Sequence, residues 1–522
     1  MLRILSREQL RAFDRLCAEQ CSVPPLSLME NAGRGAADWI AARYQRGRFK
    51  AKAGASRPER VLVVAGRGNN AGDGYVVARR LQLLGVPVEV WALYGEAELS
   101  GDALLNYRAA QASGVAVHHA AGANADELIS RASWVVDAVL GTGLSREVGS
   151  PEREAIAAMN AARAHKIALD VPSGVHADTG AVMGLAFHAD YTLTFAAHKL
   201  GFFTAAGLEH VGGVYLMDIG VPASAVRESG ESALLVEPQD VRSTLRMRSA
   251  RAHKVSAGRV AIVAGSPGKL GAALLVARGA ARAGAGLVTL VADGALAEAF
   301  DLRVLEAMTA RFEPSDLPGS LERCLEGADV VVIGPGLGFE SQAARCIEHV
   351  VLHEPRPVVV DADAISYFRG APERLAAARG PRILTPHTGE LARLLGRTSA
   401  EVERERWRAT AQAAAATRAI VLLKGPHTLV AAHDQTARVG RRGSHVLATG
   451  GAGDVLGGVI AALACELDPF DAAWVGAYLH ARSGELWAKQ RGADRGLLAH
   501  EIADGIPDAL AELSVRHGRL TL

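Results

Sequence analysis

A chain of 522 residues exceeds what one hydrophobic core usually supports, so its length predicts two domains. Hydrophobic residues make up 49% of the chain and charged residues 22%, a balance that excludes wholesale disorder. The 57 lysines and arginines nearly balance the 56 acidic residues, so no net charge would attract nucleic acid or anionic lipid.

The opening residues, MLRILSREQL, lack the apolar core of a signal peptide, and no apolar run approaches the roughly 20 residues of a membrane-spanning helix. We therefore expect a cytoplasmic protein with no nucleic-acid or membrane partner. Ser6 and Gln9 predict a capping box at the start of a first helix. The five cysteines form no C-x-x-C pair and are expected to be free thiols.

Apolar, β-branched runs then alternate with stretches at helical spacing, a pattern typical of parallel strands joined by crossover helices. In the first half the predicted strands are 61–66, 88–93, 134–141, 166–172, 191–197 and 213–220. The pattern restarts at GRVAIVAGS and continues through GLVTLVAD, DVVVIGPGLG, PVVVDADA, RILTPH and AIVLLKG. The turn-rich segment 220–243 separates the two halves, so we expect one α/β domain over 1–235 and another over 236–522.

Polar segments follow three of the predicted strands in the first half: GRGNNAGDG, GTGLSRE and DVPSG. Because ligands of a doubly wound sheet sit beyond the carboxyl ends of its strands, these segments should meet at one edge. Gly-rich turns that begin helices also present N–H groups to phosphate. The oxygen-bearing side chains there could hold a hard cation and leave one acid–base group: Asn69, Asn70, Asp73, Asp137, Asp170 and Ser173. Taken singly, each of these residues could instead be a turn former or a helix cap.

In the second half, ATGGAGDVLGG has the form of a Gly-rich loop that enters a helix, with Asp454 at the helix start. A carboxylate beside such a cradle of N–H groups suits activation of a hydroxyl in phosphoryl transfer, whereas the simpler alternative is a helix cap. Other strand ends agree with a nucleotide site. There Lys424 could neutralise phosphate or merely be solvated, and His387 could contact a ring or simply close a turn.

Four segments of the first half, LMENAG, GRGNNAGDG, VVDAVLGTG and LDVPSG, resemble the signature segments of the NAD(P)H-hydrate epimerase family. The resemblance implies a Rossmann-like domain that binds the hydrated nicotinamide cofactor and a potassium ion. The implied potassium ligands are Asn70, Asp137 and Ser173, and the implied acid–base residue is Asp170. The implied substrate site also contains Asn69, Asn70, Ala71, Gly72, Asp73, Gly141, Thr142, Gly143, Leu144, Ser145, Arg146 and Glu147. The family usually has glycine at position 71; if that residue needs a positive φ, Ala71 costs roughly 1 kcal/mol and shifts the loop slightly.

Six ordered segments of the second half, GSPGKLGA, RAGAGL, GPGLG, TPHTGE, KGPHT and GGAGD, resemble the ADP-dependent NAD(P)H-hydrate dehydratase family, which is ribokinase-like. The resemblance covers about residues 245–510. It implies that Asp454 is the catalytic base and that the hydrate is bound by Ala272, Gly336, His387 and Asp454. It further implies ADP as co-substrate, with Mg²⁺, held by Lys424, Gly425, Pro426, His427, Thr428 and Gly453.

Together the two resemblances imply a bifunctional isomerase and lyase that repairs hydrated NADH and NADPH (NADHX and NADPHX). We also expect a homo-oligomer. The alternative is a ribokinase-like vitamin or sugar kinase fused to a nucleotide-binding regulatory domain, because GAGD also serves such kinases. A first domain that only binds ligand would show no exchange between the epimers of the hydrate.

Overall fold

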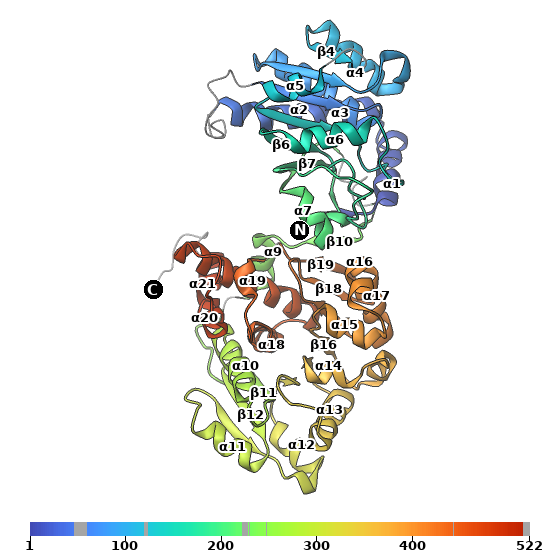
Figure 1. Cartoon of the computed structure of the whole chain (residues 1–522). Coiled ribbons are helices and arrows are strands. Elements are labelled where there is room, and N and C mark those ends of the chain that lie inside the picture. The colour runs from blue at the N-terminus through green and yellow to red at the C-terminus, as the bar shows by residue number, and fades with distance from the viewer. Residues whose placement is uncertain are drawn as a thin grey trace. The chain divides into compact units, whose positions relative to one another are not determined.

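A computed structural model describes residues 1–45, 60–119, 124–221, 228, 230–246, 248–441 and 443–514 (Figure 1). The chain forms two compact units, one of Arg3–Ser232 and one of Ala233–Leu522 together with Met1–Leu2. Residues 222–227 and 229 of the turn-rich segment predicted to separate the halves lie outside the described residues. In the described part of the chain, no helix is both long and apolar enough to cross a membrane.

The N-terminal unit is built around a parallel sheet with the strand order β4-β3-β2-β5-β6-β7-β9. Its strands are β2 (Val61–Ala65), β3 (Val88–Ala92), β4 (Ala116–His119), β5 (Trp134–Ala138), β6 (His165–Leu169), β7 (Tyr191–Phe195) and β9 (Gly213–Met217). Outside this seven-stranded sheet, β1 (Leu2–Leu5) pairs in parallel with β8 (His198–Lys199). The helices of the N-terminal unit are α1 (Arg7–Glu19), α2 (Pro25–Gln45), α3 (Asn69–Leu83), α4 (Gly101–Ala112), α5 (Ala125–Arg131), α6 (Glu152–Ala161) and α7 (Ala205–Val211). The predicted capping box of Ser6 and Gln9 begins α1.

Strand β2 explains why the apolar runs are continuous. Val61, Val63 and Ala65 belong to a core with helices α2, α3 and α4, while Leu62 and Val64 point into a second core with α5 and α6. Successive strand residues face opposite sides of a sheet, so a strand covered on both faces needs apolar side chains throughout. The unit is therefore a doubly wound α/β layer structure, as the sequence predicts (Figure 1).

The C-terminal unit contains a mixed sheet with the strand order β13-β12-β11-β14-β15-β16-β17-β18-β19-β10. Pairing is parallel from β13 to β17, antiparallel through β18 and β19, and parallel again between β19 and β10. The strands are β10 (Ala233–Leu235), β11 (Arg259–Val263), β12 (Leu287–Ala292), β13 (Met308–Arg311), β14 (Val330–Ile333), β15 (Val358–Val360), β16 (Arg382–Leu384), β17 (Ile420–Leu423), β18 (Leu429–Ala432) and β19 (Gln435–Val439).

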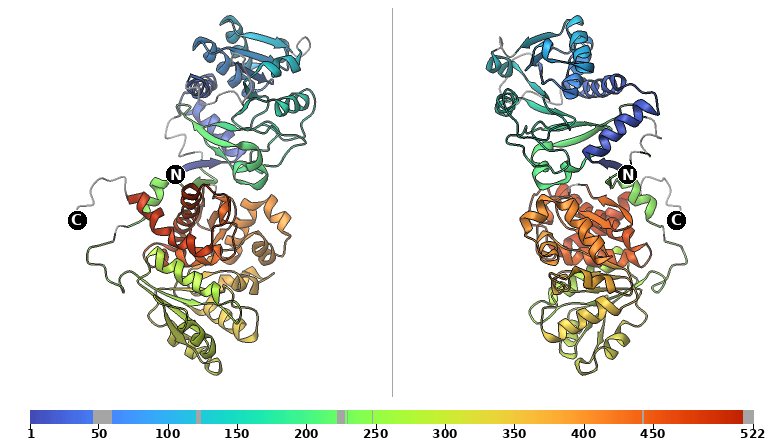
Figure 2. Two further views of the ribbon diagram at one scale, coloured as in Figure 1. Left: turned by 60° about the vertical axis from the view of Figure 1, so that its left-hand side comes forward. Right: turned by 90° about the vertical axis from the view of Figure 1, so that its right-hand side faces the viewer.

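Helices cover this sheet (Figure 2). They are α9 (Pro238–Thr244), α10 (Leu270–Ala283), α11 (Gly294–Asp301), α12 (Gly319–Leu325), α13 (Ser341–His353), α14 (Asp363–Tyr367), α15 (Thr388–Leu395), α16 (Ser399–Arg404), α17 (Arg406–Thr417), α18 (Ala452–Ala464), α19 (Pro469–Arg491), α20 (Ala499–Asp504) and α21 (Ile506–Ser514). Residues of α10, α18, α19, α20 and α21 share one core with β11, β14, β15, β16 and β17. The α/β fold class predicted for both halves is confirmed.

Glycine sets the position of α18 against α10. A Cβ added to Gly458 would lie 2.0 Å from the carbonyl oxygen of Val276, so only glycine lets the two helix backbones approach this closely. The contact fixes the N-terminal turn of α18, and with it Asp454, at the edge of the sheet.

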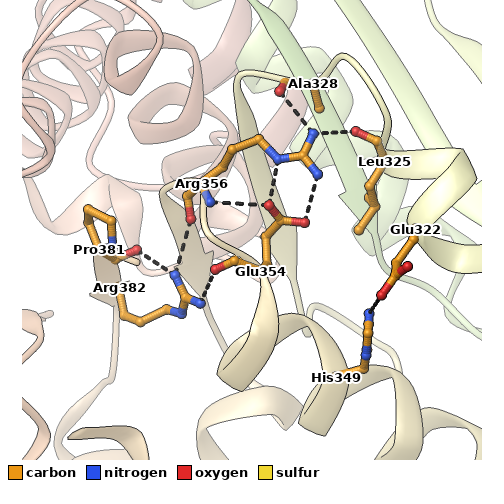
Figure 3. Close-up of polar contacts among 8 residues, drawn as sticks. All are labelled: Glu322, Leu325, Ala328, His349, Glu354, Arg356, Pro381 and Arg382. Atoms are coloured by element: carbon orange, nitrogen blue, oxygen red, sulfur yellow. Dashed lines mark hydrogen bonds and ion pairs between the residues drawn. The ribbon is translucent and has the colours of Figure 1, made fainter. Parts of the chain in front are cut away.

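A buried ion pair joins the elements at the amino ends of β15 and β16 (Figure 3). The carboxylate of Glu354 accepts from Arg356 through the guanidinium, at 2.7 Å for Nη2, and through the backbone N–H, at 3.1 Å. Arg382 donates to backbone carbonyls around it, including that of Val351 at 2.6 Å. Burial lowers the pKa of Arg382 to about 10, and the charge of Glu354 partly offsets this effect. The network therefore anchors the end of the sheet opposite to the carboxyl ends of its strands.

Candidate active sites

The N-terminal sheet brings the three predicted polar segments together. Strands β2, β5 and β6 are neighbours, so the residues that follow them share one edge. Leu140, which follows β5, is the meeting point: its carbonyl oxygen accepts from Asn70 Nδ2 at 3.0 Å, and its N–H donates to Ser173 Oγ at 2.8 Å. Helix α3 thus begins against the loops that follow β5 and β6.

Asp137 is wholly buried at this meeting point. Its carboxylate accepts from the backbone N–H and hydroxyl of Ser173, at 2.7 and 2.6 Å, and from the N–H of Val139 at 3.1 Å. Burial raises the pKa of Asp137 to about 6, although these hydrogen bonds act against the rise. None of the ion pairs found in the described part of the chain involves this carboxylate.

Asn70, which contacts Leu140 as Ser173 does, supplies an unsatisfied oxygen. Its Oδ1 atom is buried and accepts no hydrogen bond from any described residue. An unpaired buried amide oxygen is costly unless something binds it. A carboxylate without a cationic partner, an amide oxygen and a hydroxyl are hard donors that fit a small cation. No group of three or more His, Cys, Asp or Glu suited to a metal occurs among the described residues, so any cation here would depend on neutral oxygens as well.

Asp170 follows β6 in a left-handed conformation, with φ at 61°. Its Oδ1 atom accepts from the ammonium of Lys199, which is 1% exposed, and from the N–H of Phe195 at 3.2 Å. The Lys199 ammonium also contacts Thr194 Oγ1 at 2.7 Å and the Phe195 carbonyl oxygen at 2.9 Å. An aspartate at positive φ is uncommon and typical of functional loops. Lys199 was not predicted as a site residue, although it follows an apolar strand as the other site residues do.

Two more carboxyl groups interact with this ion pair. Burial raises the pKa of Asp73 well above its usual value, and the negative charge of Asp170 adds to the rise. Desolvation, followed by the charge of Asp170, raises the pKa of Asp14 to about 6. Asp14 lies on α1 and was not predicted as a site residue. The charges of Asp14, Asp73 and Asp170 therefore influence one another near the Lys199 ammonium, so this edge of the sheet can hold protons as well as charges.

The remaining predicted substrate residues line the same edge. Asn69 begins α3, Ala71 is buried in its first turn without a positive φ, and a Cβ on Gly72 would lie 2.5 Å from Met29 Sδ. The condition for strain at position 71, a positive φ, is therefore not met, because Ala71 is helical. In the loop 141–147, Gly141 and Thr142 are half-buried and Leu144 is buried. The others in this loop are exposed: Gly143, Ser145, Arg146 and Glu147.

In the C-terminal unit, Lys424 lies at the centre of the second site. It follows β17, and its Nζ atom is 2.9 Å from Asp361 Oδ1 and 4.0 Å from Glu390 Oε2. Asp361 follows β15, and Glu390 lies on α15 after β16. Asp361 and Glu390 are both buried. Burial lowers the pKa of Lys424, but the charges of Asp361 and Glu390 outweigh this effect and raise it.

The GAGD segment forms the N-terminal turn of α18 beside this lysine. Gly451 begins the helix with φ at 89°, and a Cβ added to Gly453 would lie 3.2 Å from Lys424 Nζ. Asp454 is the third residue of the helix and caps nothing through a side-chain hydrogen bond found in the described chain. Burial, with the nearby charge of Asp361, raises the pKa of Asp454 to about 6.

The predicted hydrate-binding residues also lie on strand ends of this sheet. Gly336 has φ at 63°, and a Cβ added there would lie 3.1 Å from that of Ala272 at the start of α10. His387 caps α15: its Nδ1 atom accepts from the N–H of Gly389 at 3.0 Å. Within the protein this hydrogen bond closes a turn, which is one of the two roles predicted for His387. The His387 side chain is 54% exposed.

The predicted nucleotide segment, residues 424–428, is shaped by an arginine that the sequence analysis missed. Arg406 is 4% exposed and donates to the carbonyl oxygens of Lys424 and His427, at 3.4 and 3.3 Å. A Cβ on Gly425 would lie 2.6 Å from Arg406 Nη2. Pro426 accepts from Gly443 and Thr428 from Gly440, each through its carbonyl oxygen at 2.9 Å.

These features define a class of protein with two α/β units, each of which pairs a carboxylate with a lysine at the carboxyl edge of a sheet. Residues 25–201 match the family described as YjeF-related protein N-terminus, and residues 260–508 match the NAD(P)H-hydrate dehydratase family. The bifunctional NAD(P)H-hydrate repair enzyme Nnr of Moorella thermoacetica is 36% identical over 98% of this chain and 97% of its own length. The enzyme of the same name from Escherichia coli is 32% identical over 95% of this chain and 91% of its own. The chain belongs to the family of bifunctional NAD(P)H-hydrate repair enzymes, and the family predicted from the sequence is confirmed.

Among solved structures, the ADP/ATP-dependent NAD(P)H-hydrate dehydratase of Bacillus subtilis, co-crystallised with ATP and Mg²⁺, is 31% identical with a TM-score of 0.47. The match covers 53% of this chain and 97% of that one.

Proposed function

We propose that the protein repairs NADHX and NADPHX. The N-terminal domain (1–235) interconverts the R and S epimers, and the C-terminal domain (236–522) uses ADP to convert the S epimer to NADH or NADPH, releasing AMP and phosphate. The observation that carries the proposal is that a relative of this name matches 98% of this chain, a span that contains both sites. Each site places a carboxylate beside a lysine at a sheet edge.

For the first reaction, Asp170 is the proposed proton-transfer residue. The hydrate carries a hydroxyl on C6 next to N1, so the N1 lone pair can assist opening of the C6–O bond or of the ring. Re-closure on the other face then gives the other epimer. Lys199 and the N–H of Phe195 hold Asp170 through Oδ1, which leaves Oδ2 for the substrate. The substrate would contact Asn69 to Asp73 and Gly141 to Glu147.

A potassium ion fits the buried oxygens of Asn70, Asp137 and Ser173. The fit rests on the unpartnered Oδ1 atom of Asn70 and on the absence of a cationic partner for Asp137 among the described residues. The ion would supply positive charge that compensates Asp137 and holds the start of α3 against the loops after β5 and β6. Proton transfer itself stays with Asp170.

For the second reaction, Asp454 is the proposed base that takes the proton of the C6 hydroxyl as ADP phosphorylates it. The N–H groups at the start of α18 and the Lys424 ammonium face the same point, where they would stabilise the transferred negative charge. Elimination of phosphate then restores the C5–C6 double bond. ADP, with Mg²⁺, would be held by residues 424–428 and Gly453, and the hydrate by Ala272, Gly336 and His387.

A small-molecule kinase remains the second candidate for the C-terminal domain, because the GAGD turn also suits sugar and vitamin kinases. The products separate the two. The dehydratase yields the absorbance of NADH or NADPH, together with AMP and inorganic phosphate, whereas a kinase accumulates a stable phosphorylated compound. Incubating the protein with mixed epimers and ADP, and following both epimers by chromatography, tests the proposal. Accumulation of a phosphorylated product without NADH would favour the kinase. The cytoplasmic location and the homo-oligomer expected from the sequence stay predictions.

A further inference from the structure

Asp361 is a buried carboxylate for which the proposed reaction so far has no use. It follows β15, is 1% exposed, and accepts from Lys424 Nζ at 2.9 Å. Its other carboxylate oxygen, Oδ2, lies 3.9 Å from the position of a Cβ added to Gly453. Asp361 thus stands behind the lysine, next to the first turn of α18.

The placement of Lys424 needs an explanation, because a helix N-terminus carries partial positive charge. A lysine ammonium beside the first turn of α18 is repelled by the same N–H groups that would attract phosphate. Without a compensating anion, the flexible side chain of Lys424 would turn away from this turn. Asp361 is the nearest carboxylate to the ammonium, while Glu390 lies 4.0 Å away. Asp361 therefore supplies the charge that holds Lys424 where phosphate would bind.

The backbone at Asp361 is built for this purpose. The next residue, Ala362, has φ at 50° and ψ at −115°, a strained conformation that alanine rarely adopts. A Cβ added to Gly334 would lie 2.0 Å from the Asp361 carbonyl oxygen, so the neighbouring strand end closes tightly over the turn. The strained turn is thus held by its surroundings with Asp361 pointing at Lys424.

We infer that Asp361 is a positioning residue for the second reaction: it holds the Lys424 ammonium over the first turn of α18, where the transferred phosphoryl group would lie. The inference rests on the proposed function of the C-terminal domain. Asp361 acts through Lys424 and contacts neither ADP nor the hydrate.

The test is a double-mutant cycle in the full chain. Asp361→Asn keeps the shape of the side chain and removes the charge of its hydrogen bond to Lys424. We expect kcat for ADP-dependent dehydration to fall about tenfold with KM for the hydrate unchanged, and no further fall when Asp361→Asn is added to Lys424→Met. The same loss of kcat from Asp361→Asn in Lys424→Met as in the parent, or parent-like turnover of Asp361→Asn alone, would overturn the inference.

Asp329→Asn is the matched control. Asp329 precedes β14 at the opposite end of the sheet, where its Oδ2 atom accepts from the N–H of Arg259 at 2.8 Å. We expect parent-like kcat for this variant. A tenfold loss here as well would show that losing any aspartate of this sheet impairs turnover, and the inference would fall.

Binding of ADP with Mg²⁺ separates this inference from the proposed function. If the parent binds ADP but does not convert the hydrate, the proposed function fails, and the same cycle is read as Kd for ADP. Asp361→Asn should then weaken ADP binding several-fold in the parent and leave it unchanged in Lys424→Met. Equal weakening in both backgrounds would contradict a role through Lys424.

Should Asp361→Asn not fold, Gly453→Ala asks the same question from the other side. The added Cβ would lie 3.2 Å from Lys424 Nζ, so the ammonium would have to shift by a few tenths of an ångström while Asp361 stays intact. We expect a loss of kcat in the parent and no further loss in Lys424→Met. A further loss in Lys424→Met would overturn the inference.

Discussion

The raised pKa of Asp454 predicts how the dehydratase responds to pH. A base must be ionised to accept the hydroxyl proton, and burial together with Asp361 places the pKa of Asp454 at about 6. Above pH 7 nearly all of the protein carries the ionised base. At pH 5 about a tenth of it does, so kcat should fall about tenfold between pH 7 and pH 5 and tenfold again for each further unit.

The assay is the appearance of NADH from the S epimer at saturating ADP and hydrate, corrected at each pH for the uncatalysed change of the hydrate. In the Lys424→Met background, Asp361→Asn should move the acidic limb to lower pH, because the charge of Asp361 is the largest contribution after burial to the raised pKa of Asp454. A flat kcat from pH 5 to pH 8 would refute the role of Asp454 as base. An acidic limb that Asp361→Asn shifts upward in this background would refute the electrostatic reasoning.

Three further predictions concern the ion pairs and the potassium site. Lys199→Met should slow epimerisation about 100-fold and leave dehydration of the S epimer unchanged, because the substitution removes only the cation that orients Asp170. Equal loss of both activities would contradict the assignment of Lys199 to the first reaction alone. KCl should raise the thermal unfolding midpoint of the parent relative to choline chloride, and Asp137→Asn should abolish this rise because it removes the charge that a potassium ion compensates. An undiminished effect of KCl on Asp137→Asn would place the ion elsewhere. Glu354→Gln should lower the free energy of unfolding of the C-terminal unit by about 3–5 kcal/mol in a denaturant titration, because it removes the negative charge beside Arg356 and Arg382 (Figure 3). The exposed Glu322→Gln should cost less than about 0.5 kcal/mol. Similar effects of the two substitutions would refute this prediction.

The sequence predicts much of this architecture because a parallel sheet leaves a plain pattern. Strands buried on both faces, such as Val61–Ala65, must be apolar throughout, and the residues just after them must lie at the carboxyl edge. That rule brings together Asn70, Leu140 and Ser173, which are far apart in the chain.

The residues that the sequence analysis missed are partners of predicted ones. Lys199 and Asp361 are recognisable only once Asp170 and Lys424 are placed beside them, since a lone lysine or aspartate after a strand is usually solvated. Asp14 comes from a helix at the start of the chain, and nothing in its local sequence points to the sheet edge. At position 71, the family's usual glycine left open whether a positive φ is needed, and the first turn of α3 holds Ala71 in a helical conformation.

The most direct test of the two-site account compares Asp170→Ala and Asp454→Ala with the parent on mixed epimers, with and without ADP. We expect the parent with ADP to consume both epimers. Asp170→Ala should consume the S epimer and leave the R epimer unchanged. Asp454→Ala should restore NADH from neither epimer while it still exchanges the two. Consumption of both epimers by Asp170→Ala beyond their spontaneous exchange, or near-normal ADP-dependent turnover by Asp454→Ala, would contradict the two-site account.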